Sequence, residues 1–230
     1  MIGLFKSLSE AIRGKPIRAG RVYMRPPQRR DCRKWLKIRA ESRKFLQTWE
    51  PTWPADSLTR KAFSRRLKTY AFQSNTDTGY VFLVFRQEDH ALIGSIAIND
   101  VRRGVAQNCS IGYWVGEQYA GNGYMTEALS GLLPIIFLRL KIHRIEAACL
   151  PNNEASQALL EKIGFRREGF AERYLKINGT WQDHILYGLL DTDAKIAPVP
   201  AAQLIKKKKD RGIKSKRFKA STSPARSSEI

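Results

Sequence analysis

The stretch Ile111–Thr126, IGYWVGEQYAGNGYMT, decides the fold of this chain. Its first residues alternate between apolar and polar side chains, which predicts a strand over 107–115. The stretch then turns at Gly121 and Gly123 and opens a helical pattern that runs to Leu140. A helix that begins directly after a glycine turn presents free backbone N–H groups and the positive end of its dipole. Because glycine has no Cβ, a bulky anion can approach closely, so the stretch predicts a pyrophosphate-binding loop.

Two other phosphate-binding motifs do not fit this stretch. No Gly-Lys-Ser or Gly-Lys-Thr follows the glycines, as the loop of nucleoside triphosphatases requires. The third glycine and the later acidic residue of a dinucleotide-binding unit are also absent. Taken alone, the string is equally compatible with an ordinary glycine turn between a strand and a helix.

The composition is that of a globular chain with a large excess of positive charge. A length of 230 residues with 43% hydrophobic content allows one good core. The net charge of +20 indicates a polyanionic neighbour, for which RNA, DNA and anionic lipid are the candidates. The three cysteines have no CxxC spacing, which argues against a disulfide framework, a redox motif and a metal site. We therefore expect no metal and a reducing, cytoplasmic compartment.

The order of the hydrophobic patterns defines the fold class. They predict strands over 21–25, 80–86, 91–99, 107–115, 143–150, 165–176 and 180–190, and helices over 31–40, 42–46, 58–73, 124–140 and 154–163. Ser57 is the expected N-cap of the third helix, and Asn178-Gly179 is the expected turn of the closing hairpin. We predict one α/β domain over 21–190, with a mixed central sheet of about seven strands and helices on both faces.

Extensions flank this domain. Residues 1–20 form an N-terminal extension, of which 1–15 has the spacing of a frayed helix or of an amphipathic helix on a membrane surface. Residues 191–230 form a basic tail that includes the run Lys206–Lys209 and cannot bury itself, so we expect it to be disordered. It either contacts the ribosome or RNA, or is a solvated tail. The apolar stretch Leu132–Leu140 is too short to span a bilayer, so no transmembrane segment is expected.

Two motifs resemble those of the GNAT N-acetyltransferase superfamily. Gln118-x-x-Gly121-x-Gly123 is similar to the acyl-CoA pyrophosphate loop of that superfamily. Asn153-x-x-Ser156, followed by a helix end that reads L-x-x-x-G-F, is similar to its helix after the fifth strand. The resemblance covers about 21–190. It implies the GNAT fold and the transfer of an acetyl group from acetyl-CoA to a primary amine.

Further stretches resemble the bacterial ribosomal-protein-alanine N-acetyltransferases. They are Ser42–Leu46 with Trp49-Glu50-Pro51, 99–104, Gly123–Met125 with Glu127–Leu129, 143–145, Arg167–Gly169, Tyr174-Leu175 and Gly179–His184. This closer resemblance implies that the acceptor is the N-terminal alanine of a ribosomal protein. Thr48 stands where that family usually has proline, so we expect the substrate loop to differ in detail. The basic tail also extends beyond the family core.

The resemblance assigns cofactor-binding residues to the strand, the loop and the later helix. They are Tyr113, Trp114, Val115, Gln118, Tyr119, Ala120, Gly121, Asn122, Gly123, Tyr124, Asn153 and Ser156. The loop backbone would cradle the pyrophosphate, and the strand and Asn153 would bind the pantetheine arm. Ser156 is the expected general acid for the leaving sulfur, although many GNAT enzymes carry a tyrosine where this chain has Leu160. A hydroxyl bonded to helix backbone is the alternative role for Ser156.

The general base is less well defined. An N-terminal α-amine has a pKa of about 8, so a carboxylate acting through water suffices. Glu50, in the aromatic loop, is the first candidate, followed by Asp183 and Glu172. His143 and His184 are assigned to strand packing or hydrogen bonding. Four aromatic residues either wall a groove for a peptide end or pack into the core and rim: Trp49, Trp53, Tyr174 and Trp181.

Two other functions remain open from the sequence. A GNAT enzyme of this kind could acetylate another amine, such as a small metabolite, an antibiotic or a lysine side chain. A non-catalytic RNA-binding protein could use the same fold as a scaffold. Acetylation assays with a panel of peptide N-termini and free amines distinguish the first alternative from acetylation of a ribosomal protein. Salt-sensitive RNA binding without thiol release identifies the second alternative.

Overall fold

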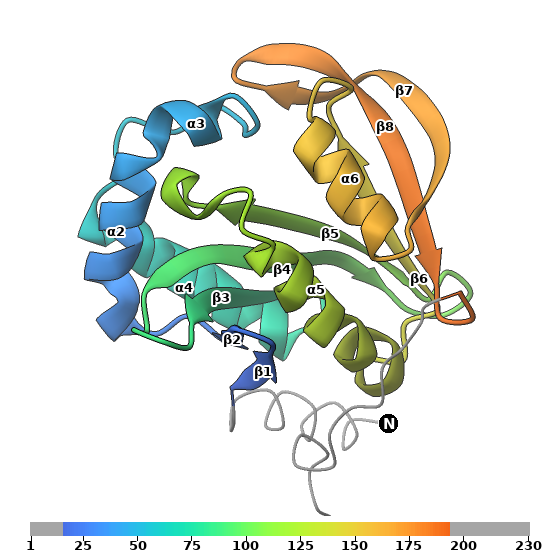
Figure 1. Cartoon of the computed structure of the whole chain (residues 1–230), viewed down its shortest axis with the longest axis horizontal. Helices are drawn as coiled ribbons and strands as arrows, with labels where there is room; N and C mark the ends of the chain where they lie inside the picture. The colour runs from blue at the N-terminus through green and yellow to red at the C-terminus, as the bar shows by residue number, and fades with distance from the viewer. Residues whose placement is uncertain (1–15, 194–230) are drawn as a thin grey trace, which may run out of the picture.

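The computed structural model describes residues 16–193, which form one mixed sheet with helices on both faces (Figure 1). The strands are β1 (Ile17–Ala19), β2 (Val22–Arg25), β3 (Tyr80–Arg86), β4 (Leu92–Arg102), β5 (Asn108–Val115), β6 (Arg144–Cys149), β7 (Arg166–Ile177) and β8 (Thr180–Leu190). The helices are η1 (Arg29–Asp31), α2 (Cys32–Glu41), α3 (Arg43–Gln47), α4 (Arg60–Asn75), η2 (Glu117–Tyr119), α5 (Tyr124–Pro134), η3 (Ile135–Arg139) and α6 (Glu154–Lys162). The predicted helix over 1–15 and the basic tail from 194 onward lie outside the described residues.

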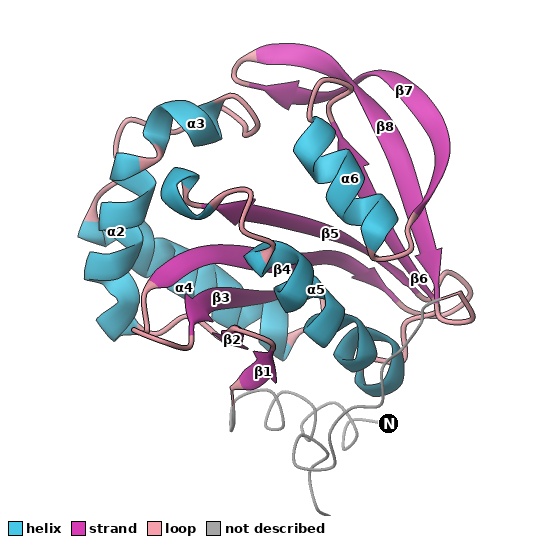
Figure 2. Cartoon of the chain, in the orientation of Figure 1, coloured by secondary structure: helices cyan, strands magenta, loops and turns pink. Residues whose placement is uncertain are grey.

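The strand order is β1-β2-β3-β4-β5-β6-β8-β7, and every neighbouring pair except one is antiparallel. The exception is β5–β6, which is parallel and pairs only from Asn108↔Arg144 to Ser110↔Glu146. Beyond these residues β5 stays with β4, while β6 stays with β8. The two central strands therefore separate within the sheet, as Figure 2 shows.

Helices α5 and α6 cover one face of the sheet, and α2 and α4 cover the other (Figure 1). Strand β3 contributes to the hydrophobic core on each side. Phe82 and Val84 are fully buried in the core that includes α5. Leu83 and Phe85 instead pack with Trp35 in the core formed by α2 and α4. Because successive side chains on a strand point to opposite faces, burial on both sides explains the uninterrupted apolar run of β3.

The fold prediction is confirmed, and three of its details are corrected. The sheet has eight strands because β1, only three residues long, pairs with β2; a strand of that length shows no readable alternation. Helix α4 is capped by Thr59 and not by Ser57, since the Thr59 hydroxyl accepts the Ala62 N–H at 3.1 Å. The long helix ends at Pro134, after which 135–139 is a π-helical turn closed by a bond from Leu140 N–H to the Ile135 carbonyl. No helix within residues 16–193 has both the length and the apolarity to cross a bilayer.

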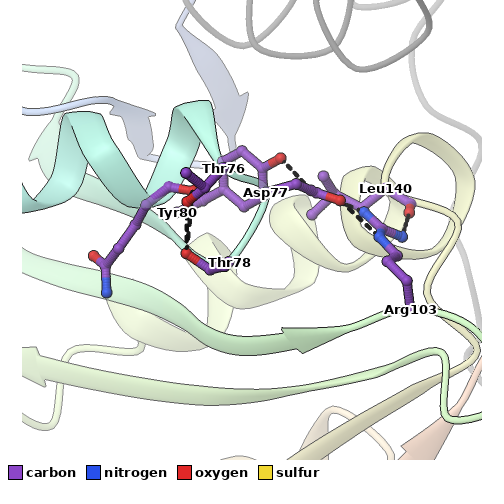
Figure 3. A network of polar contacts seen from close by, with 7 residues as sticks. Thr76, Asp77, Thr78, Tyr80, Arg103 and Leu140 are labelled. Atoms are coloured by element: carbon purple, nitrogen blue, oxygen red, sulfur yellow. Dashed lines mark hydrogen bonds and ion pairs between the residues drawn. The ribbon is translucent and has the colours of Figure 1, made fainter. Parts of the chain in front are cut away.

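A polar network joins the end of the π-helical turn to two other turns (Figure 3). The Asp77 carboxylate accepts bonds from Tyr80 Oη at 2.6 Å and from Arg103 Nε at 2.7 Å. Arg103 also donates to the carbonyl of Leu140, and Thr76 and Thr78 are joined through their hydroxyls at 3.0 Å. Burial raises the pKa of Tyr80, which keeps its hydroxyl a donor. The network therefore ties the end of the π-helical turn, four residues before β6, to the turns after α4 and β4.

Candidate active site

A cavity of about 550 Å³ lies where β5 and β6 separate. It is bounded by the loop after α3, the glycine turn before α5, and helix α6. On the β6 side, residues 111–115 of β5 have no strand partner among the described residues. Their backbone N–H and C=O groups form an internal edge, with which an extended chain of amides can pair as an added strand.

All but two of the residues predicted to bind the cofactor line this cavity. The lining ones are Tyr113, Trp114, Val115, Tyr119, Ala120, Gly121, Gly123, Tyr124, Asn153 and Ser156. Gln118 and Asn122 lie outside the lining. The Asn122 side chain instead donates to the Ala120 carbonyl at 2.9 Å and shapes the turn. The fold thus gathers the strand, turn and helix residues around one space, and their contact with a cofactor stays a prediction.

The glycine turn has the geometry that the sequence led us to expect. Gly121 and Gly123 have φ angles of +73° and +77°, a left-handed region that favours glycine. A Cβ on Gly121 would meet no protein atom within 4 Å, so this position faces open space. Gly123 is the N-cap of α5 and provides no side chain to accept the first N–H groups of the helix. These N–H groups are available to an external anion.

Arg21 fastens the turn to the β1–β2 connection, which the sequence did not reveal. Its Nε donates to Glu127 Oε1 at 2.7 Å, and its Nη2 donates to the Asn122 carbonyl at 2.7 Å. The Arg21 guanidinium also lies over the Tyr124 ring, 4.6 Å from the centroid. The ion pair of Arg21 and Glu127 therefore lies beside the turn. No local signal could have identified it, because Arg21 and Glu127 are 106 residues apart.

A pair of hydroxyls lies on the wall formed by β5 and α6. Ser156 Oγ and Tyr113 Oη are 2.8 Å apart, so the Ser156 hydroxyl bonds to a side chain. Asn153 caps α6, with its Oδ1 accepting the Ser156 N–H at 3.1 Å. Burial raises the pKa of Tyr113, and it raises the pKa of the neighbouring Cys149 to about 11. The tyrosine and the thiol are therefore protonated at neutral pH.

Glu50 reaches the cavity from the loop after α3, and two donors hold its carboxylate. Arg39 donates to both oxygens at 2.6 Å, and Trp53 Nε1 donates to Oε2 at 2.7 Å. Arg39 is 5% exposed, and its guanidinium lies over the rings of Trp53 and Trp114. Trp53 is thus a packing residue under this ion pair, whereas Trp49 lines the cavity itself.

His184 also lines this cavity, and its imidazole is a second candidate for accepting the proton of an amine. It is 3% exposed, and its Nδ1 lies 2.9 Å from the Gln182 carbonyl, so the Nδ1–H tautomer leaves Nε2 as the acceptor. The sequence had assigned His184 to strand packing or hydrogen bonding, and its bond to the Gln182 carbonyl agrees with the second of these roles. The other two carboxylate candidates do not line the cavity: Asp183 accepts the Arg173 N–H at 2.8 Å, and Glu172 is an exposed residue of β7. His143 contacts Asp191.

The β7–β8 hairpin approaches the loop after α3 beside the cavity. The Asn178 N–H donates to the Glu50 carbonyl at 3.0 Å, which joins the hairpin tip to the loop. Tyr174 and Trp181 on this hairpin are 48% and 58% exposed, so they are not core residues. Tyr174 also packs edge-on against His184, with ring centroids 5.8 Å apart.

Comparison with known proteins agrees with this architecture. Residues 21–166 match the family model "Acetyltransferase (GNAT) domain". The chain is 35% identical to "Probable N-acetyltransferase YjcK" of Bacillus subtilis over 172 residues, which cover 75% of this chain and 95% of that protein. It is 32% identical to the ribosomal protein uS5-alanine N-acetyltransferase of Escherichia coli over 173 residues, which cover 75% and 89%.

Solved structures give the same result. RimJ of Mycobacterium smegmatis in complex with CoA-disulfide has a TM-score of 0.72 and 31% identity, covering 77% of this chain and 87% of that one. Ribosomal-protein-S5-alanine acetyltransferase from Vibrio fischeri has a TM-score of 0.73 and 28% identity, covering 79% and 99%. Together with the matched family model, these similarities confirm the resemblance of the two motifs. The chain belongs to the GNAT family of acetyltransferases.

Proposed function

We propose that this acetyltransferase moves an acetyl group from acetyl-CoA to the N-terminal alanine of a ribosomal protein in the cytoplasm. The observation that carries the proposal is its relation to the Escherichia coli uS5-alanine enzyme, at 32% identity over 89% of that protein. The loop after α3 and the β7–β8 hairpin flank the cavity and provide Trp49, Tyr174 and Trp181 for a peptide end. Aromatic side chains of this kind supply large contact areas for a short peptide.

The chemical groups around the cavity support the binding of coenzyme A. The open face of Gly121 and the uncapped first turn of α5 suit a pyrophosphate, and Arg21 holds the turn through the Asn122 carbonyl. The unpaired edge of β5 suits the amides of a pantetheine arm. Acetyl-CoA supplies the activated thioester, and the residues of this chain bind it, orient it and handle the protons.

Ser156 is proposed as the donor of a proton to the leaving sulfur. Its hydroxyl lies in the cavity and is held by Tyr113, which acts as a positioning residue. The raised pKa of Tyr113 keeps this partner protonated, so the hydroxyl pair can present a proton to the cavity.

Two groups can remove the proton from the acceptor amine. Glu50, as the sequence indicated, would act through water, since its oxygens already accept three bonds from Arg39 and Trp53. His184 would act directly through Nε2. The α-amine itself has a pKa of about 8, so the demand on either group falls as the pH rises.

Replacing Gly121 with Glu should weaken coenzyme A binding by about a hundredfold or more, because a negative side chain would face the pyrophosphate. Gly104→Glu is the matched control. Gly104 has a φ of +67° and open space around its Cβ, so backbone strain is similar, but it lies outside the cavity lining. Isothermal titration calorimetry measures both variants. Equal affinities of the two variants for coenzyme A would contradict the assignment of the glycine turn as the pyrophosphate site.

Ser156→Ala should lower kcat by about a hundredfold, within the usual range for a general acid, while coenzyme A affinity changes little. Ser156→Thr keeps a hydroxyl at this position and should retain a substantial part of the rate. Steady-state release of free thiol measures the effect. An unchanged kcat in Ser156→Ala would exclude the proton-donor role.

Glu50→Gln and His184→Gln distinguish the two proton acceptors through their pH profiles. In the variant that lacks the true base, the deficit in kcat/KM should shrink as the pH rises through about 8, because the amine then arrives neutral. A residue with only a structural role gives a deficit that is constant with pH. If neither profile shows rescue at high pH, both assignments are wrong. Thermal unfolding checks Glu50→Gln, which leaves Arg39 without its partner.

The acceptor is tested with peptides and amines. We expect acetylation of peptides that begin with alanine, and none of the same peptides with a blocked N-terminus. Mass spectrometry detects the added acetyl group and its position. Preferential acetylation of lysine side chains, antibiotics or small amines would replace the proposed acceptor. An absence of thiol release with every amine, together with RNA binding, would indicate the non-catalytic alternative.

A further inference from the structure

The positive charge of the described domain is concentrated on one layer. Residues 29–75, which form α2, α3 and α4, contain 13 Lys and Arg but only 4 Asp and Glu. The remaining described residues, 16–28 and 76–193, contain 14 of each sign. The sheet, α5 and α6 are therefore electrically balanced, while the helices along one edge and behind the sheet carry the whole excess (Figure 1).

Much of this charge is exposed and without a carboxylate partner. The residues concerned are Arg33, Arg43, Lys44, Arg60, Lys61 and Lys68, which we call the basic helix layer. All six are exposed, and none forms an ion pair with a carboxylate among residues 16–193. Surface charges of one sign that are left uncompensated create a field that attracts polyanions.

Helix α4 of this layer places cations where helix stability disfavours them. Arg60 and Lys61 lie in its first turn, which contains no acidic residue. The first turns of α5 and α6 instead contain Glu127 and Glu154, which complement the helix dipole. Such a local conflict between charge and dipole is expected where a surface serves binding and not stability.

The chemistry of the layer fits RNA better than a membrane. Eight of the 13 basic residues in 29–75 are arginine, the side chain that binds phosphate through two parallel hydrogen bonds. A groove of about 740 Å³ runs between 25–30 and α4, lined by Arg29, Arg30, Lys68 and Tyr70 among others. Phe72 is the single large hydrophobic side chain exposed on this layer. Membrane-surface helices need a continuous apolar face, which one phenylalanine does not provide.

We infer that the basic helix layer binds the phosphate backbone of structured RNA and docks the enzyme beside its acceptor. Helix α3 carries Arg43 and Lys44 and then continues into Phe45 and Leu46, which line the active-site cavity. RNA held on this layer would therefore lie next to the entrance for the acceptor chain. The RNA interaction itself is independent of the proposed function, which only adds that the RNA belongs to the ribosome.

The test uses the full chain with two charge-matched double variants. Arg60→Glu with Lys61→Glu reverses two of the six charges of the basic helix layer. Arg102→Glu with Lys141→Glu makes the same charge change at exposed sites elsewhere. The basic tail is present in all three proteins, so its contribution is common to them. The first variant also places acids in the first turn of α4, so its thermal stability should not fall.

Binding of a labelled RNA duplex of about twenty base pairs is measured against salt concentration. We expect the layer variant to bind about tenfold more weakly, with a salt dependence reduced by about 1.5 in the logarithmic slope. The control should change less than about threefold. Equal losses in both variants, an unchanged affinity in the layer variant, or tighter binding to phosphatidylglycerol vesicles than to RNA would overturn the inference.

Acetylation of a free alanine peptide separates this inference from the proposed function. Neither double variant touches the cavity, so turnover of the free peptide should equal that of the unmodified chain. Loss of RNA binding with intact peptide acetylation is the supporting result. If the unmodified chain binds RNA normally but acetylates no peptide, the inference of an RNA-binding surface stands and the proposed acceptor is wrong.

Discussion

The structure depends on how briefly β5 and β6 pair. Three parallel residue pairs hold the two strands, and beyond Ser110 each strand is held only by its other neighbour. An opening inside a sheet leaves backbone N–H and C=O groups without the hydrogen bonds that a neighbouring strand would provide. Here the opening creates the cavity, an unpaired edge of β5 and room for the end of α6. The glycine turn, the hydroxyl pair and the loop after α3 are all arranged around it.

The elements around the opening are held by contacts between distant parts of the chain. Arg21 fastens the glycine turn from the first hairpin, Arg39 holds Glu50 from α2, and Arg103 fixes the segment that precedes β6. In each case a guanidinium spans two elements, which its length and its fork of donors make possible. The site is therefore positioned by polar contacts as well as by the two hydrophobic cores.

The sequence was sufficient for the fold, and ten of the twelve residues that it assigned to the cofactor line the cavity. Strand alternation, the glycine turn and the second motif are local patterns, and the structure confirms the elements that they predict. The roles of Arg21 and Arg39 and the pairing of Tyr113 with Ser156 depend on contacts between elements, which no local pattern contains. The position of His184 at the cavity could not be predicted, because it follows from the path of β8. The short β1 and the choice of Thr59 as a cap depend in the same way on tertiary context.

The bond between Asn178 and Glu50 has a consequence for which substitutions this side of the cavity can tolerate. It joins a backbone N–H to a backbone carbonyl, so substitutions at either side chain leave the contact between the hairpin and the loop in place. The main chain therefore holds the two segments together, while side chains such as Trp49 and Trp181 determine the chemistry of their surfaces. Those side chains can be exchanged without rebuilding the backbone that carries them.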